Sequence, residues 1–327
     1  YIVESVAGVL DSAEISYVKW DMNRQMAGAG GAFAHRYILG LYEVLHRIFD
    51  KRPEILFESC SSGGNRFDLG MLCFSPQIWA SDDTDPIERL DIQKGLSYLY
   101  PLSTMGAHVS ASPHAQTLRR TPLDTRFAVS CFGCLGYELD LRELTPVELK
   151  EARRQIAFYK KHRMTLQYGR LYRFELLDGR EAFSCVARDG SEAVTGHFRR
   201  LVHAAPPFEK LPAAGLDPGA LYEVESRPPL LRIADFGALI KHALPVKLRP
   251  GGPVLRAADA LAGLRQETER YTASGAALLT LDNGAGQMQS DPLTSKWSRP
   301  LPHRANGGSN TNRYSSYFRP LRASCTK

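Results

Sequence analysis

The sequence has no long hydrophobic run, no signal-peptide pattern in its first residues and too few cysteines for a disulfide framework. No stretch of 18 apolar residues occurs in its 327 residues, so we expect no membrane partner. The start, YIVESVAGVLDSAEIS, lacks the basic segment and cleavage site of a secreted precursor. Six cysteines in a chain this long favour free thiols and a cytoplasmic protein. Because the first residue is Tyr1 rather than Met, we expect the true N-terminus to lie further upstream.

The net positive charge of the sequence comes from its last 45 residues. The whole sequence carries a formal charge of +6. From Asn283 to Lys327 there are seven Lys/Arg and one acid, Asp291, which gives +6 for that segment and leaves 34 basic and 34 acidic residues before it. A neutral body has no electrostatic footprint for a polyanion. We therefore expect no nucleic-acid partner.

Several motifs of cofactor and metal chemistry are also missing. Gly63-Gly64 follows an apolar run but is not completed by Gly-Lys-Ser/Thr, so a phosphate-binding loop is not indicated. Cys131 and Cys134 have the spacing of a zinc or redox pair without a second pair or a histidine at a suitable distance. The sequence contains no HExxH and no GxSxG. We expect no metal and no cofactor.

Short apolar runs alternate with helical stripes over the first 165 residues. Strand, helix and strand at such intervals are typical of a parallel sheet with crossover helices. Chemistry in these folds gathers just past the carboxyl ends of the strands. The expected strands lie near residues 15–20, 55–57, 78–80, 102–109 and 136–141, and the polar residues at their ends are Asp21, Glu58 to Cys60, Asp82-Asp83, His108 and Glu138 to Asp140.

One helix is predicted to begin at Pro86, and a second is predicted to follow a capping box formed by Thr145 and Glu148. Beyond this second helix the pattern changes. From Leu171 onward, short alternating runs are separated by DGR, DGS, DPG and PGG turns, which is typical of a small antiparallel β domain. The last 45 residues show no usable periodicity, and we expect them to be disordered or badly packed. The predicted division is a catalytic part at 1–165, a β domain at 166–282 and a basic tail at 283–327.

Two aspartates at different strand ends have contrasting surroundings. Asp21 follows Lys19 by two residues, so both side chains would share a strand face, and the cation would keep the aspartate ionised. Asp82 has Asp83 and Asp85 nearby, which would favour its protonated form. An ionised acid and a protonated acid are the pair that glycoside hydrolysis requires. Spacing alone leaves open that both residues cap the turns or helices that follow.

The segment ESCSSGGNRFD at 58–68 also allows two interpretations. It could be a flexible loop between a strand and a helix. Alternatively, its small residues would let a sugar approach the backbone, with Cys60 or Ser62 in contact.

Four segments together carry a family resemblance. YVKWDMNR, FESCSSGGNRFDLGML, WASDDTDPIERLDIQ and PLSTMGAHVSASPHAQTLRRTPLDTRF occur in this order, with GYELDL and LRIADFGALIKHALPVKL further on. The chain resembles family 36 of the glycoside hydrolases, the bacterial α-galactosidases, from about residue 1 to 280. The resemblance implies part of a (β/α)8 TIM barrel, about strands 4–8, followed by a small antiparallel β-sandwich-like domain.

The resemblance also implies roles for individual residues. It assigns Asp21 as the nucleophile and Asp82 as the acid/base of a retaining glycosidase that releases terminal α-galactose from melibiose- or raffinose-type substrates. It implies sugar contacts for Lys19, Asn23, Cys60, Ser62 and Trp79. A homo-oligomer is implied for the full-length protein.

The chain departs from the family pattern at both ends. A leading β domain and the first barrel strands are not in it, and after Leu281 the expected closing strands give way to the basic tail. We therefore interpret it as a fragment whose reading frame changes near residue 282. Three alternatives stay open: a relative that transfers galactosyl groups, as raffinose synthases do, a truncated, non-catalytic remnant, and a sugar-binding module without hydrolysis.

Overall fold

A parallel sheet forms the first half of the protein. The computed structural model describes residues 1–24, 30–176, 179–201, 211, 213–233, 236, 242, 249, 252–261, 263–265, 268–280 and 315–323. Five strands form the sheet in the order β1-β2-β3-β4-β5, and each neighbouring pair is parallel. The strands are β1 (Tyr17–Trp20), β2 (Leu56–Ser59), β3 (Gln77–Trp79), β4 (Met105–Ser110) and β5 (Cys134–Glu138).

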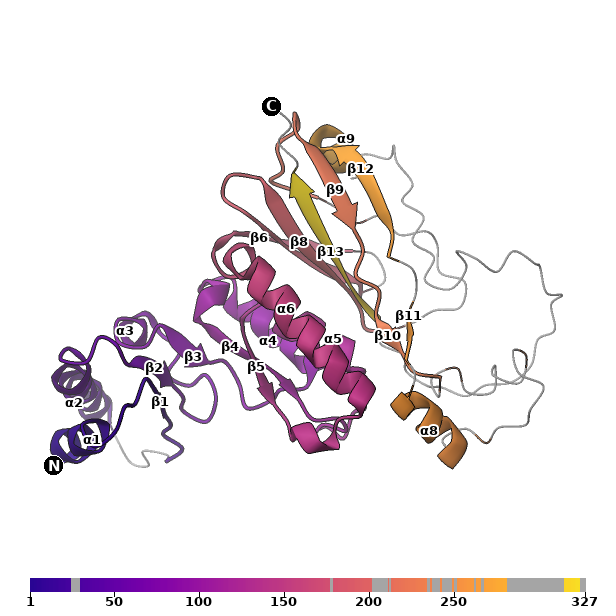
Figure 1. The fold of residues 1–327 in the computed structure, drawn as a ribbon. Helices are drawn as coiled ribbons and strands as arrows, with labels where there is room; N and C mark the ends of the chain where they lie inside the picture. Colours follow the sequence, from indigo (N-terminus) through magenta and orange to yellow (C-terminus); the bar gives the residue numbers. More distant parts are fainter. Residues whose placement is uncertain are drawn as a thin grey trace.

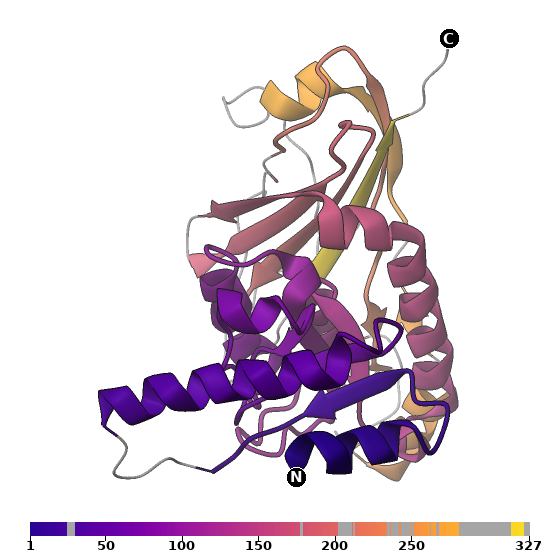
Figure 2. The same cartoon turned by 90° about the vertical axis from the view of Figure 1, so that its left-hand side faces the viewer.

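Helices connect these strands and cover one face of the sheet (Figure 1). In Figure 2 the long α2 runs beside β1, with α1 close to the same strand. The helices are α1 (Ile2–Leu10), α2 (Gly31–Phe49), α3 (Leu69–Leu72), α4 (Pro86–Leu96), α5 (Leu123–Ser130) and α6 (Pro146–Tyr168), with the 3-10 turns η1 (Leu102–Thr104) and η2 (Leu141–Glu143). This arrangement is a partial (β/α)8 barrel and confirms the predicted fold class.

Capping residues fix where the two clearest helices begin. Asp85 precedes α4, and its carboxylate accepts a hydrogen bond from the Ile87 amide at 2.8 Å. Thr145 precedes α6, and its hydroxyl and the Glu148 carboxylate form the predicted capping box. Both starts agree with the sequence-based prediction.

An antiparallel sheet forms the second half. Its strands lie in the order β12-β9-β13-β8-β7-β6, and β10 and β11 form a separate antiparallel pair. The elements are β6 (Arg170–Glu175), β7 (Glu181–Val186), β8 (Glu192–Arg199), β9 (Leu221–Glu225), β10 (Leu230–Leu231), α8 (Pro253–Leu261), β11 (Leu264–Arg265), β12 (Arg270–Ser274), α9 (Gly275–Thr280) and β13 (Ser315–Ala323).

Strand β13 differs from the expectation for the tail. The sequence pattern predicts no regular structure after residue 282, whereas Ser315–Ala323 pairs with both β8 and β9. The pairing partners lie far upstream in the sequence, so no local pattern predicts them. The rest of the tail lies outside the described residues, as does most of the segment at 231–248 that supports the family resemblance.

One hydrophobic core continues from the parallel sheet into the antiparallel sheet. Ile78 and Met105 are fully buried beneath the helices of the partial barrel. Phe132, directly after α5, is also fully buried and packs edge-on against Phe183 of β7 and Phe198 of β8, at ring-centroid distances of 5.7 and 6.0 Å. The two sheets therefore share a single packed interior rather than a solvated seam.

Candidate active site

Asp21 lies directly after β1, where hydrogen bonds stabilise its ionised form. Asn23 Nδ2 donates to Asp21 Oδ2 at 2.8 Å. Partial burial raises the pKa of Asp21, but the hydrogen bonds from Asn23, the Cys60 thiol and the Ser62 and Met22 amides outweigh it, so the pKa lies below its ordinary value. The side chain is exposed and open to a ligand.

The lowered pKa of Asp21 agrees with the prediction, but its expected cause does not. Lys19 Nζ lies 3.4 Å from Oε1 of Glu58, its register partner on β2, and 4.4 Å from the centre of the Trp79 ring. The largest contributions that lower the pKa of Asp21 are hydrogen bonds, not the charge of Lys19. Lys19 thus forms its ion pair with Glu58, its cross-strand neighbour, whereas the sequence pattern predicted that it would stabilise Asp21.

Glu58 is the buried carboxyl of this group. It is 1% exposed and receives hydrogen bonds from the Tyr17 hydroxyl and from Gln77 Nε2, the latter at 2.9 Å. Burial raises the pKa of Glu58 to about 7, the Gln77 hydrogen bond lowers it and the charge of Glu138 raises it further.

The loop after β2 holds the predicted sugar contacts Cys60 and Ser62. Cys60 is 2% exposed, and its amide donates to the Trp20 carbonyl at 2.9 Å. The Ser62 amide and hydroxyl both donate to Asn23 Oδ1, at 3.1 and 3.0 Å. Burial raises the pKa of the Cys60 thiol to about 11, so this thiol stays protonated and can donate to Asp21.

Asp82 lies three residues beyond Trp79, after β3. The Trp79 indole Nε1 donates to Asp82 Oδ1 at 2.9 Å. Trp79 itself is 3% exposed, while the Asp82 side chain is exposed. The indole therefore anchors one carboxylate oxygen and leaves the other accessible.

The loop after β2 also contacts the backbone at Asp82. Gly63 has φ +82°, and a Cβ atom there would lie 2.9 Å from Ser81 Cα and 3.1 Å from the Asp82 amide nitrogen. A Cβ on Gly64 would lie 2.6 Å from the Ala80 carbonyl oxygen. Only glycine permits this approach. One short loop thus touches Asp21 through Ser62 and the backbone of Asp82 through Gly63.

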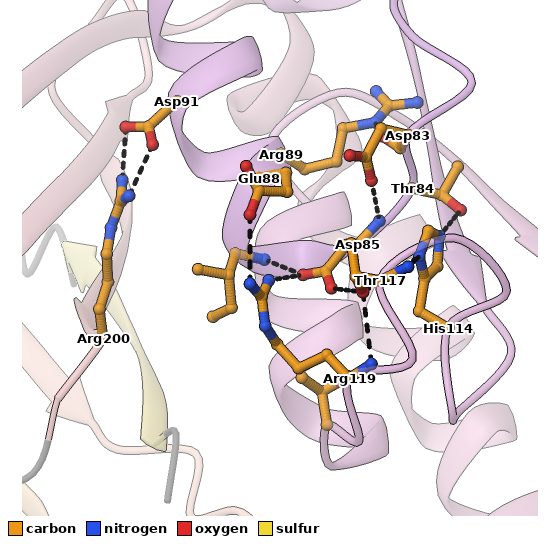
Figure 3. Close-up of polar contacts among 12 residues, drawn as sticks. Asp83, Thr84, Asp85, Glu88, Arg89, Asp91, His114, Thr117, Arg119 and Arg200 are labelled. Carbon is orange, nitrogen blue, oxygen red and sulfur yellow. Dashed lines mark hydrogen bonds and ion pairs between the residues drawn. The ribbon is translucent and has the colours of Figure 1, made fainter. Parts of the chain in front are cut away.

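A polar network holds the turn that carries Asp82 (Figure 3). Arg119, from the loop after β4, donates to Asp85 Oδ1 at 2.6 Å and pairs with Glu88 at 3.2 Å. The Thr117 hydroxyl also donates to Asp85. Burial raises the pKa of Asp85, but the hydrogen bonds from Thr117, the Ile87 amide and Arg119 lower it below its ordinary value. A buried, ionised aspartate thus ties this turn to the neighbouring loop.

The sequence prediction did not include three residues near Trp79. His108 lies with its ring centre 4.4 Å from that of Trp79, and its Nδ1 is 3.3 Å from Glu138 Oε2. The guanidinium of Arg89 lies 4.7 Å from the centre of the same indole. His108 and Glu138 were visible as polar strand ends, whereas Arg89 comes from the buried face of α4 and no motif singled it out.

The predicted site residues thus fall into two clusters joined by the loop after β2. One contains Asp21, Asn23, Cys60 and Ser62, and the other contains Asp82, Trp79 and Lys19. Among the described residues, no group of three or more His, Cys, Asp or Glu is placed to hold a metal ion. In the same part of the chain, every helix is too short or too polar to cross a bilayer.

Comparisons with known proteins give consistent results. The alpha-galactosidase AgaA of Geobacillus stearothermophilus is 48% identical over 236 residues, which are 69% of this chain and 32% of the relative. The solved alpha-galactosidase of Lactobacillus brevis aligns with a TM-score of 0.73 and 32% identity, covering 99% of this chain and 38% of that structure. A substituted form of AgaA in complex with raffinose aligns with a TM-score of 0.68 and 35% identity, with the same coverage of 99% and 38%.

The chain spans about a third of the length of the curated relatives it matches. The family model described as Melibiase matches residues 1–169, and the one described as Glycosyl hydrolase family 36 C-terminal domain matches residues 180–281. The first match covers more than half of the sequence, so the chain belongs to the melibiase family, within family 36 of the glycoside hydrolases.

Proposed function

We propose that this chain supplies the cleavage site of a retaining α-galactosidase, with Asp21 as nucleophile and Asp82 as acid/base. The contacts of the loop after β2 carry this proposal. Its Ser62 amide contacts the Asp21 carboxylate, and its Gly63 packs against the Asp82 amide. A retaining glycosidase needs its two carboxyl groups about 5–6 Å apart, and a loop that contacts both strand ends favours such a separation.

The reaction proceeds in two displacements. In the first, the Asp21 carboxylate forms a bond to the anomeric carbon while the bond from that carbon to the glycosidic oxygen breaks and Asp82 gives its proton to that oxygen. In the second, Asp82 takes a proton from water as the water oxygen bonds to the anomeric carbon and displaces Asp21. Two inversions restore the original configuration and both carboxyl groups.

The surrounding groups support the two roles. A nucleophile must be ionised, and the hydrogen bonds on Asp21 favour that form. We assign Lys19, Asn23, Cys60, Ser62 and Trp79 as the residues that contact the galactose. The complex of the AgaA relative with raffinose supports a substrate that ends in an α-linked galactose.

We also infer that the protein works in a reducing compartment, the cytoplasm, as an oligomer of identical full-length chains. The described cysteines, Cys60, Cys73, Cys131, Cys134 and Cys185, are free, which supports the first inference. Light scattering of the full-length protein tests the second.

The test measures turnover of raffinose and 4-nitrophenyl α-galactoside by the purified chain. We expect Asp21→Ala to abolish turnover and Asp82→Ala to reduce it by about 10²–10⁴-fold. Asp50→Asn is the matched control, because this exposed aspartate follows α2, away from the carboxyl ends of the strands. Proton NMR of the first-formed sugar should show α-galactose. Initial β-galactose, or turnover that survives Asp21→Ala, would contradict the assignment. Transfer to sugar acceptors in place of hydrolysis would indicate a transferase.

A further inference from the structure

Arg89 of α4 reaches beneath the turn that carries Asp82. Its Nη2 donates to the Ser81 carbonyl at 2.7 Å and its Nε donates to the Asp83 carbonyl at 2.7 Å, so it binds the residues on either side of Asp82. Its Nη1 donates to the Gly106 carbonyl of β4 at 3.0 Å. One planar side chain thus fastens the turn after β3 to the neighbouring strand. Figure 3 shows Arg89 directed toward Asp83.

The same guanidinium contacts the residue that binds the Asp82 side chain. It lies 4.7 Å from the centre of the Trp79 ring, whose Nε1 donates to Asp82 Oδ1 at 2.9 Å. Lys19 Nζ also lies close to this ring, at 4.4 Å. Cations near an aromatic face are attracted to its electron density and restrict its movement. Arg89 therefore contacts the backbone on both sides of Asp82 and the indole that binds the Asp82 carboxylate.

The free-energy cost of burying the Arg89 cation indicates that this side chain does more than fill space in the core. Arg89 is 2% exposed, and within the described residues its three hydrogen bonds all go to backbone carbonyls. Burial lowers the pKa of Arg89 to about 10, although the charges of Glu138, Asp83 and Asp82 act in the opposite direction. Burying a cation on neutral acceptors costs free energy that a packed apolar side chain would not require. Lysine lacks the planar fork that reaches several acceptors at once.

We propose that Arg89 is the positioning residue of Asp82. It fixes the backbone on both sides of Asp82 and orients Trp79 so that the indole N–H occupies Oδ1. The indole N–H binds Oδ1, so Oδ2 is the carboxyl oxygen left free to face the glycosidic oxygen of a substrate. The proposal rests on the assignment of Asp82 as acid/base for its catalytic meaning, but its geometry can be tested without turnover.

The first test observes the Trp79 indole by NMR. The sequence has three tryptophans, so the chain labelled with ¹⁵N-tryptophan gives three indole signals. The signal that is lost in Trp79→Phe belongs to Trp79. Asp82→Ala should move this signal upfield because the acceptor is lost. Arg89→Met should move it in the same direction, and Arg89→Lys should move it less.

The matched control is Arg126→Met. Arg126 of α5 is also buried, at 5% exposed, burial likewise lowers its pKa to about 10, and it donates to the Ser110 carbonyl. Its loss removes a comparable buried guanidinium and should leave the Trp79 signal in place. The proposal would be overturned if Asp82→Ala shifts the Trp79 signal but the Arg89 variants do not. It would also be overturned if Asp82→Ala leaves the Trp79 signal unshifted. If near-UV circular dichroism shows that Arg89→Met is unfolded, the shift of the Trp79 indole signal in Arg89→Lys tests the proposal instead.

The second test uses leaving groups that differ in their need for a proton. Melibiose requires protonation of its leaving group, whereas 4-nitrophenolate leaves with little assistance. Arg89→Lys should lower kcat/KM for melibiose about 10-fold more than for 4-nitrophenyl α-galactoside. The ratio of the two values does not depend on the folded fraction, so a purely structural role predicts an unchanged ratio. A parent chain without turnover would contradict the proposed function, and the indole signals would then decide on Arg89 alone.

Discussion

The pH dependence of stability should report on the buried Glu58. A carboxyl whose pKa rises on folding holds its proton more tightly in the folded state. Its contribution to stability is complete below its ordinary pKa of 4.5 and is lost as pH rises through its folded value of about 7. Lys19 lies 3.4 Å away, but its side chain is 39% exposed, so solvent screens its charge and the burial of Glu58 dominates.

The size of the effect follows from that interval. At 1.36 kcal/mol per pH unit, the difference between 4.5 and about 7 corresponds to about 3 kcal/mol. Glu58→Gln keeps an acceptor for Tyr17 and Gln77 but does not titrate. Between pH 4.5 and 7, the parent chain should therefore lose about 3 kcal/mol more of its free energy of unfolding than the variant.

Urea unfolding followed by tryptophan fluorescence at half-unit pH steps measures this difference. Other titrating groups contribute to both proteins and cancel in the comparison. Glu143→Gln is the control, because Glu143 is an exposed glutamate in η2 and should reproduce the parent curve. Parallel curves for the parent chain and Glu58→Gln would refute the reasoning that burial dominates at this site.

Three further predictions concern the loop after β2, the shared core and the thiols. Gly63→Ala should cost about 1–3 kcal/mol and lower the melting temperature, because φ is +82° and the new Cβ would meet Ser81 Cα at 2.9 Å; an unchanged melting temperature would contradict this close approach. Phe132→Ala should cost about 3–5 kcal/mol in chemical unfolding, since its ring is fully buried against both sheets. Iodoacetamide should label the exposed Cys73 well before Cys60, because the Cys60 thiol is buried and its pKa is raised to about 11. Mass spectrometry of the digested chain measures both rates, and equal labelling of the two cysteines would contradict the prediction.

Local patterns were sufficient to predict most of the fold. The change from period two to period 3.6 located every strand of the parallel sheet, and the Thr145 and Pro86 signals located the starts of α6 and α4. These features depend on neighbours within a few residues, which the sequence displays directly. Strand β13 depends on partners far upstream, so the same reasoning missed it. The division at residues 165 and 282 stays a prediction.

The candidate site was only partly predictable for a related reason. Strand ends placed Asp21 and Asp82 at the same edge of the sheet, because parallel strands bring their carboxyl ends together. The partner of Lys19 depended on register, which pairs it with Glu58, and the sequence does not reveal register. Arg89 was missed because its role depends on which face of α4 packs inward and on carbonyl groups that no side-chain motif encodes.

The continuous interior around Phe132 limits how this protein can be recombined with its relatives. A crossover at the junction of α6 and β6 would place one parent's Phe132 against another parent's Phe183 and Phe198. Hybrids should therefore fold well only when these three aromatic positions are inherited together, even though they lie on different sides of the crossover. For this chain, we expect the outcome of module exchange to depend more on the fit of this buried aromatic cluster than on the choice of linker.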